Sequence, residues 1–454
     1  MLFYTRWVWV IQGIQGFALF LLGAYISRTV VGGFLSTLMF SHIRPFATRA
    51  FFTVSLRENF AMPFFWLRIL FLTIMFRSKL KENQLKMCLV ALSFSTFCFS
   101  SSWQLSPFIL FAQGLSLYGG AMLNALNMRS VESVLGCDAI IVFIVGILHF
   151  GYPLFCLSPA IFCSALVILS NKYYPPKPAN QRRFIPVVMR CLAILFGGVF
   201  LSTFMKSLFG AADDNHVGKL FLAKLNLAYH HDFDVNMYLA SSVFRALPLS
   251  FFVDMTAGAF LLVPIYCICH LVFLLGILLV FEETTTTTKP LGSYEKKKKD
   301  DDAKEEEEKE ENKEKKGNES NNTQPSLLAY LLLRRPELTM NALISVPMAL
   351  LGMFIQRLQL LWTPHMCIFY TWVISTPAIY TLIPLPGFLK RWVPRICRYV
   401  VPTFVILVIC SGYLPAIRQE LSFEYRQRFQ GNLTSINYHL HLLIVYPDFR
   451  SRCC

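Results

Sequence analysis

The sequence predicts an all-α polytopic membrane protein, and three observations lead to this fold class. Of the 454 residues, 55% are apolar and only 15% are charged, whereas soluble domains are about one quarter charged. Apolar runs long enough for membrane helices recur along most of the chain. The basic residues form short clusters between these runs, not one continuous basic face, so the net charge of +15 does not indicate a nucleic-acid partner. A soluble enzyme and a disordered tail protein are equally poor fits.

About twelve apolar segments approach the roughly 20 residues that a helix needs to cross a bilayer. In chain order they cover residues 8–26, 30–42, 60–77, 86–102, 107–127, 133–150, 155–170, 185–206, 256–281, 340–356, 364–383 and 397–416. The segments 30–42 and 155–170 are short, so a re-entrant conformation is an open alternative for both. Residues 1–40 lack a basic leading region and a small-residue cleavage site, so no cleavable signal peptide is expected.

One hydrophilic insertion interrupts the apolar pattern. Between Glu282 and Asn322 there are 10 Lys and 14 acidic residues, which leaves 32 basic and 13 acidic residues, a formal +19, for the other 413 positions. The insertion consists of runs of Thr, Lys and Glu with few large apolar side chains, so burial cannot compensate the entropy of ordering. We therefore predict a disordered loop at 282–325 that divides the membrane core into residues 1–281 and 326–416.

The basic clusters predict the orientation of the chain, because Lys and Arg concentrate in short cytosolic loops. Strict alternation of the twelve segments places five groups on one side: Arg77, Lys79, Lys81 and Lys86; Arg129; Lys172, Lys177, Arg182 and Arg183; the 282–325 insertion; and Lys390, Arg391, Arg395 and Arg398. That side is predicted to be cytosolic. Loops 43–59 and 207–255 and the C-terminal segment 417–454 then face the lumen, although the three arginines within 43–59 run against the rule.

Polar residues concentrate at three places on the predicted lumenal side, and the first is Leu56-Arg57-Glu58-Asn59-Phe60. It brings a cation and a carboxylate to the start of an apolar segment, where a helix N-terminus can bind an anion. The alternative is a local Arg57–Glu58 pair that anchors the helix end.

The second place is the loop that contains Asp213, Asp214 and His216. Adjacent carboxylates beside a histidine are suited to general-base chemistry or metal binding. An ordinary loop, in which one aspartate caps a following helix, is the more common explanation. No metal site is predicted elsewhere, because Cys267, Cys269 and His270 lie within an apolar segment with no fourth ligand nearby and are expected to pack in the core.

The third place joins Arg357, at the end of one apolar segment, to His365, at the start of the next. An arginine at the depth of the membrane interface can bind a phosphate through two parallel hydrogen bonds. An arginine that extends along a helix end towards water is the competing interpretation.

Four blocks of sequence in this order resemble a known family. They are Leu-Arg-Glu-Asn-Phe at 56–60, Phe-Gly-Ala-Ala-Asp-Asp-Asn-His-Val-Gly at 209–218, Asp-Phe-Asp at 232–234, and Thr-Pro-His-Met-Cys at 363–367 after Arg357-Leu358. With this order and spacing, the chain from about Trp7 to Pro415 resembles the tryptophan C-mannosyltransferases of the endoplasmic reticulum, the Dumpy-nineteen-like family. Four ordered blocks are far more specific than any one of them.

The resemblance implies a GT-C-type glycosyltransferase membrane core in the endoplasmic reticulum membrane, with a lumenal active site. The donor would be dolichyl-phosphate mannose, a lipid-linked sugar, and the acceptor the first Trp of Trp-x-x-Trp sequences in secretory-pathway polypeptides. Neither a cofactor nor a nucleic-acid partner is implied. In this family comparison Arg357 would hold the lipid phosphate, with Arg57 as a second candidate beside Glu58. Asp213, Asp214 and His216 would shape the donor or acceptor pocket, and His365 would line the phosphate site.

The sequence departs from the family pattern in two places. The family's first lumenal loop, with its catalytic acidic residue, would lie upstream of Met1, so no catalytic residue is assigned in this chain. After Arg418-Gln419-Glu420 the family continues into a soluble α/β domain, whereas residues 417–454 do not follow that pattern. A fragment of a C-mannosyltransferase is therefore expected, and the alternative is a non-catalytic membrane scaffold or anchor of the same fold.

Three N-glycosylation sequons provide a test of the predicted orientation. We expect a glycan on Asn432, in the predicted lumenal segment, and none on Asn318 or Asn321, which lie in the predicted cytosolic insertion. The measurement is the endoglycosidase-sensitive gel shift of single Asn→Gln variants. Glycans on Asn318 or Asn321 with none on Asn432 would invert the orientation.

Overall fold

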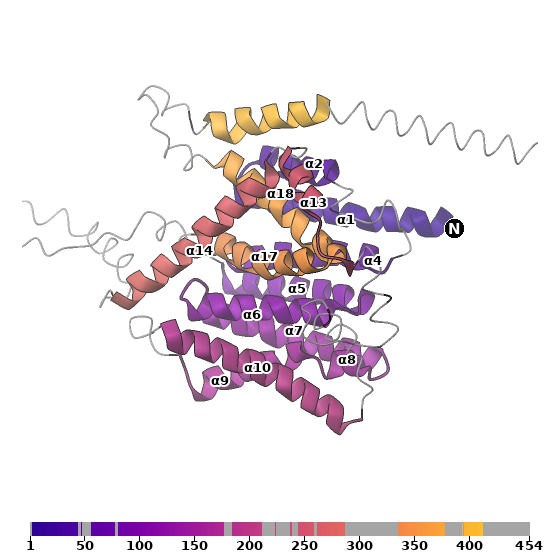
Figure 1. Ribbon diagram of the computed structural model, residues 1–454, viewed down its shortest axis with the longest axis vertical. Coiled ribbons are helices and arrows are strands. Elements are labelled where there is room, and N and C mark those ends of the chain that lie inside the picture. The colour runs from indigo at the N-terminus through magenta and orange to yellow at the C-terminus, as the bar shows by residue number, and fades with distance from the viewer. Residues whose placement is uncertain are drawn as a thin grey trace, which may run out of the picture.

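The computed structural model describes residues 2–43, 47, 56–77, 80–176, 184–210, 223, 237, 244–257, 261–286, 335–376, 393 and 395–411. Within these residues the regular elements are all helices (Figure 1). The helices of the N-terminal half are α1 (Leu2–Ser27), α2 (Val30–His42), α4 (Glu58–Met75), α5 (Glu82–Ser102), α6 (Ser106–Met122), α7 (Met128–Leu148), α8 (Pro153–Cys156), α9 (Pro159–Tyr173) and α10 (Phe184–Leu208). Those of the C-terminal half are α13 (Leu249–Ala257), α14 (Leu262–Thr286), α17 (Pro336–Phe354), the 3-10 turn η3 (Gln356–Leu358), α18 (Gln359–Ser375) and the π-helical turn η4 (Ile396–Val400), after which the helix continues to Ser411.

The all-helical membrane fold is confirmed for the described residues. Eight helices are long and apolar enough to cross a membrane, which identifies a multi-pass membrane protein. Each of the twelve predicted segments overlaps a helix, but four of these helices are not among the eight: α2, α6, α18 and the helix 396–411. The number of twelve spans therefore stays a prediction. Helix α14 continues to Thr286, a few residues into the predicted insertion, and the rest of 282–325 lies outside the described residues.

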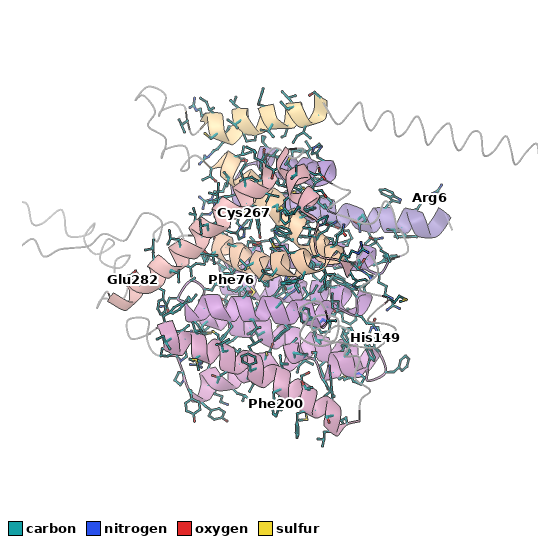
Figure 2. All side chains as sticks on the ribbon, in the orientation of Figure 1. Arg6, Phe76, His149, Phe200, Cys267 and Glu282 are labelled. Atoms are coloured by element: carbon teal, nitrogen blue, oxygen red, sulfur yellow. The ribbon has the colours of Figure 1, made fainter. Side chains whose placement is uncertain are left out.

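The helices lie side by side in a stack, from α9 and α10 at one end, past α2, to the helix 396–411 at the other (Figure 1). Most residues of α4, α17 and α18 are buried, so these helices form the centre of the stack. In contrast, most of α10 is exposed, and side chains such as Phe200 extend from the lower edge of the molecule (Figure 2). An apolar side chain exposed on a membrane helix is suited to contact with lipid, so α10 is expected to face the bilayer.

Helices α1 and α2 pack closely because the residues at their interface are small. A side chain at Gly23 would collide with Ser36, and one at Gly33 would lie 2.7 Å from the carbonyl oxygen of Phe20. The Ser36 hydroxyl also donates to the Leu19 carbonyl at 2.9 Å, which satisfies it in the apolar interior. Membrane helices commonly associate in this way: glycine lets the two backbones come close, and serine forms a hydrogen bond across the interface.

A fully buried ion pair joins α4, α5 and α7. The Nη2 atom of Arg68 lies 2.6 Å from Oδ2 of Asp138, and neither side chain exceeds 6% exposure. Thr96 on α5 lies between them, since its hydroxyl is 3.4 Å from Asp138 Oδ1 and 3.5 Å from Arg68 Nη1. A charge without a partner would be very costly at this depth. The pair therefore fixes the positions of three helices along one another.

Removal of one charge from this pair should destabilise the fold. We expect Asp138→Leu to lower the free energy of unfolding by about 3–5 kcal/mol, because it leaves Arg68 buried and unpaired. The double variant Arg68→Met/Asp138→Leu should recover most of this loss. Denaturant unfolding in detergent measures the effect, with Lys86→Gln in the exposed Lys86–Glu82 pair as the control. An Asp138→Leu variant as stable as the control would contradict this role.

Candidate functional site

The candidate site begins at the first turn of α4, where Glu58 is buried. A carboxylate is favoured there by the dipole at the helix N-terminus. Pro63 follows one turn later and has no N–H, so it cannot bond to the Asn59 carbonyl in the helical pattern. Gln12 of α1 donates to that carbonyl instead, at 2.6 Å. The proline thus opens a position in the first turns of α4 that α1 fills, and this contact holds Glu58 in place.

A break between α17 and α18 presents Arg357. Ile355 has an extended backbone (φ −132°, ψ 105°), and the chain then forms the single turn η3 before α18 begins. Gly352 allows the chain after the break to pass close to the end of α17, because a Cβ atom at residue 352 would lie only 3.2 Å from the Gln359 Cα. The segment before α13 bonds to the break, with Gln356 N donating to the Arg245 carbonyl and Leu247 N to the Met353 carbonyl, both at 2.9 Å.

An ion pair between Arg357 and Glu58 joins these two parts of the chain, 299 residues apart. Arg357 Nε donates to Glu58 Oε1; the arginine side chain is 30% exposed and the carboxylate only 1%. The guanidinium also lies over the Phe244 ring, 5.7 Å from its centroid. Its two terminal nitrogens make no hydrogen bond within the described part of the chain. Glu58 therefore orients the guanidinium by one edge and leaves the outer two nitrogens for another group.

Two further arginines lie beside this pair. Arg57 precedes Glu58 and is exposed at the start of α4. Arg245 is also exposed, and its carbonyl bonds to the residue before Arg357. Three arginines and one carboxylate therefore gather where α4 begins and α17 ends. We call this set, Arg57, Arg245, Arg357 and Glu58, the Arg357 site.

Sequence reasoning paired Arg57 with Glu58 and Arg357 with His365, whereas the structure pairs Glu58 with Arg357. It also missed Arg245, which lies in a predicted lumenal loop but not in any of the motifs. Its position beside Arg357 is shown by the hydrogen bond from Gln356 N to its carbonyl. The one signal in the sequence was a basic residue in a predicted lumenal loop, which is weak evidence for a site residue.

His365 lies in the interior, about two helical turns beyond Arg357. It is 0% exposed and packs edge-on against Trp66 of α4, with 4.8 Å between the ring centroids. Neither imidazole nitrogen, nor the Trp66 indole nitrogen, has a hydrogen-bond partner among the described residues. Buried polar atoms usually have partners. These three atoms are therefore buried polar groups whose hydrogen-bonding capacity is unused among the described residues.

The other predicted site residues cannot be placed. Asp213, Asp214, His216 and the sequon at Asn432 lie outside the described residues. In the part of the chain that is described, no three His, Cys, Asp or Glu side chains come close enough to hold a metal ion.

Of the three residues predicted to pack in the core, Cys269 and His270 do so, whereas Cys267 is exposed on α14. Cys269 is buried, and His270 bonds to the Tyr266 carbonyl at 2.9 Å and to the Ser345 hydroxyl. These contacts join α14 to α17.

Comparison with known proteins identifies the family. A family model described as "Dpy19: Q-cell neuroblast polarisation" matches residues 1–430. The chain belongs to the Dpy19 family. The resemblance predicted from the four sequence blocks is thereby confirmed.

Several relatives are named as C-mannosyltransferases. The chain is 28% identical to mouse "Protein C-mannosyl-transferase DPY19L1" over 53% of this chain and 32% of that protein. It is 23% identical to human "Probable C-mannosyltransferase DPY19L4" over 92% of this chain and 54% of that protein. Identity to Caenorhabditis elegans "C-mannosyltransferase dpy-19" is 27%, over 55% of this chain and 36% of that protein. The chain thus spans about one third to one half of the length of the relatives that it matches.

Because Glu58 is buried and Arg357 is partly exposed, substitutions of these two residues should affect stability to different extents. We expect Arg357→Met to lower the free energy of unfolding by about 2–3 kcal/mol, because it leaves the buried Glu58 carboxylate without a cation. Glu58→Gln should cost less than about 1 kcal/mol, because the partly exposed Arg357 can hydrate. Thermal and denaturant unfolding in detergent measure both, with the exposed Arg57→Gln as control. Equal effects of the two variants would contradict this explanation.

Proposed function

We propose that this Dpy19-family chain takes part in C-mannosylation, the transfer of mannose from dolichyl-phosphate mannose to the first Trp of Trp-x-x-Trp sequences. In this proposal it forms the GT-C-type membrane core, with about twelve spans in the endoplasmic reticulum membrane and the Arg357 site on the lumenal side. The single observation that supports it most is the Arg357–Glu58 pair. It holds one arginine at a helix break with its two terminal nitrogens available.

The reaction needs a cation where the lipid phosphate departs. The bond between the sugar and the phosphate oxygen breaks, a carbon–carbon bond to C2 of the indole forms, and the proton on that carbon leaves. Negative charge therefore develops on the phosphate as it departs. An oriented guanidinium with two parallel donors matches a phosphate, and fixed donors of this kind stabilise developing charge strongly in a site shielded from water.

The surroundings of Arg357 strengthen its interaction with an anion. The N-terminus of α4 carries partial positive charge, and Arg57 and Arg245 add two full charges nearby. Glu58 neutralises one charge and in return fixes the orientation of the guanidinium. Arg57, Arg245 and Arg357 are then the proposed phosphate ligands, and Glu58 is a positioning residue.

The proposed proton acceptor is a different carboxylate. Glu58 is poorly suited to the role, because its carboxylate is already bonded to the Arg357 guanidinium. Asp213 and Asp214 are the proposed candidates from this chain, with His216 in the same sequence motif. His365 and Trp66, with their unpartnered buried nitrogens, are proposed to contact the sugar or the phosphate between α4 and α18.

Substitution of Arg357 tests the proposal. We expect Arg357→Ala to reduce mannosylation about 100-fold or more, the usual effect of removing one donor to a developing oxyanion. Arg357→Lys should recover activity only in part, because lysine keeps the charge and loses the paired donors. The assay co-expresses the chain and a secreted Trp-x-x-Trp reporter in cells without this modification and quantifies mannosyl-tryptophan by peptide mass spectrometry.

A matched control is Arg129→Gln, an exposed arginine on the opposite predicted face, which should leave labelling unchanged. Labelling that survives Arg357→Ala in a chain of normal abundance would remove Arg357 from the site. A reporter that stays unlabelled with the unaltered chain would favour the alternative, a non-catalytic membrane scaffold or anchor.

A further inference from the structure

A second arginine cluster lies at the other ends of the same helices. Arg28 follows α1, Arg77 follows α4, and Arg335 precedes α17. We call these three residues the Arg335 cluster. Helices α4 and α17 have 18 and 19 residues, so at 1.5 Å per residue they separate the Arg335 cluster from the Arg357 site by about 27 Å. This is close to the hydrocarbon thickness of a bilayer, about 30 Å.

Arg335 forms the base of the cluster. Its Nε atom lies 2.9 Å from Glu337 Oε1, and its Nη2 donates to the Ile26 carbonyl at the end of α1, also at 2.9 Å. The side chain is only 15% exposed and that of Glu337 only 7%. Asn341, one turn along α17 from Glu337, donates to Thr73 of α4 at 2.9 Å. These bonds join the ends of α1, α4 and α17 in one place.

Arg77 and Arg28 belong to the same cluster through the end of α1. The guanidinium carbon of Arg77 lies 6.0 Å from the centroid of the Tyr25 ring. Arg28 comes two residues after Ile26, whose carbonyl Arg335 binds. Both arginines are exposed, and within the described residues no carboxylate lies within ion-pair distance of either. Among the described residues of this cluster, only Arg335 is therefore paired with a carboxylate, that of Glu337.

The backbone at Arg28 indicates that its side chain serves a purpose there. Its φ of 59° lies in the left-handed region, which glycine or asparagine adopts with less strain than arginine. The flanking hydroxyls hold this turn: Ser27 donates to the Gly23 carbonyl at 2.6 Å, and Thr29 caps α2 by accepting from Gly32 N at 3.1 Å. A residue less suited to the backbone thus occupies a turn held by hydrogen bonds, two residues after the Ile26 carbonyl that Arg335 binds.

The charge of the cluster is only partly compensated. Burial lowers the pKa of Arg335, Glu337 opposes that change, and the positive charge of Arg28 lowers the pKa further. A bound anion would relieve the repulsion between Arg28 and Arg335 and would pair with the two exposed arginines. The natural anion at the membrane interface is a phosphate carried by a lipid.

We propose that the Arg335 cluster binds the phosphorylated headgroup of an anionic membrane lipid at the predicted cytosolic face. Basic pockets between membrane helices at this face recognise such headgroups, because the cytosolic leaflet is negatively charged. Arg28 and Arg77 supply the exposed donors, and Arg335, fixed by Glu337 and Ile26, supplies the base of the site. The proposal does not depend on the mannosyltransferase reaction, since the cluster lies at the opposite end of α4 and α17.

The test measures lipid binding by the purified full chain in phosphatidylcholine nanodiscs. The probe is phosphatidylinositol 4-phosphate with eight-carbon acyl chains, titrated by microscale thermophoresis. We expect saturable binding that the double variant Arg28→Gln/Arg77→Gln weakens about 30-fold, on the basis of about 1 kcal/mol for each basic residue at a charged surface. Arg335 stays unchanged because it holds three helices together. Equal melting temperatures without lipid confirm that the variant is folded.

A matched control removes two charges elsewhere on the same predicted face. Arg129 and Lys172 are exposed, and Arg129→Gln/Lys172→Gln should leave the affinity within about twofold of the original, in keeping with screening over distance. An equal loss in this control would overturn the proposal in favour of non-specific attraction. Inositol 1,4-bisphosphate that binds as tightly as the lipid would overturn the membrane-lipid source. Binding that does not saturate would overturn the site itself.

Discussion

The requirement that every buried charge has a partner governs this structure. Away from water an unpaired ion is very costly, so the arginines and carboxylates of α4 must meet residues of other helices. Glu58 meets Arg357 from the break after α17, and Arg68 meets Asp138 from α7. The two pairs join α4 to parts of the chain that are far apart in sequence. Helix α4 is therefore central because its charges determine which helices surround it.

Interruptions of regular helix structure explain where function can reside. Pro63 opens the first turns of α4, and the extended residue Ile355 separates α17 from α18. Such breaks are tolerated in membrane proteins where other protein groups satisfy the freed backbone atoms. Gln12 and the segment around Arg245 do so here. The result is a rigid site in which the Glu58 carboxylate orients Arg357. Helix α10, in contrast, has no such break and is expected to face lipid along most of its length.

The two ends of the α4–α17 pair differ in chemistry although both are rich in arginine. At one end Glu58 is buried and Arg357 is partly exposed, so the guanidinium is presented outwards. At the other end Arg335 and Glu337 are both largely buried, and Arg28 and Arg77 provide the exposed charge. The first arrangement suits a reacting phosphate that must be oriented. The second suits a stable headgroup held by several charges. Arginine is thus proposed to bind two different phosphate groups, because the residues around it differ at the two ends.

The sequence by itself determined the membrane class, the helical segments and the family, because apolar length and local motifs are properties of neighbouring residues. It also selected Arg57, Glu58 and Arg357 as candidate site residues, and that role stays a proposal. Its twelve segments all overlap helices, although the chain alone did not indicate which helices are central. Only the tertiary structure decided that Glu58 pairs with Arg357, that Arg245 joins them, and that Arg68 meets Asp138. An ion pair between residues 299 positions apart leaves no local pattern. It forms because packing buries the Glu58 carboxylate, which then needs a cation as its partner, beside the helix break that presents Arg357.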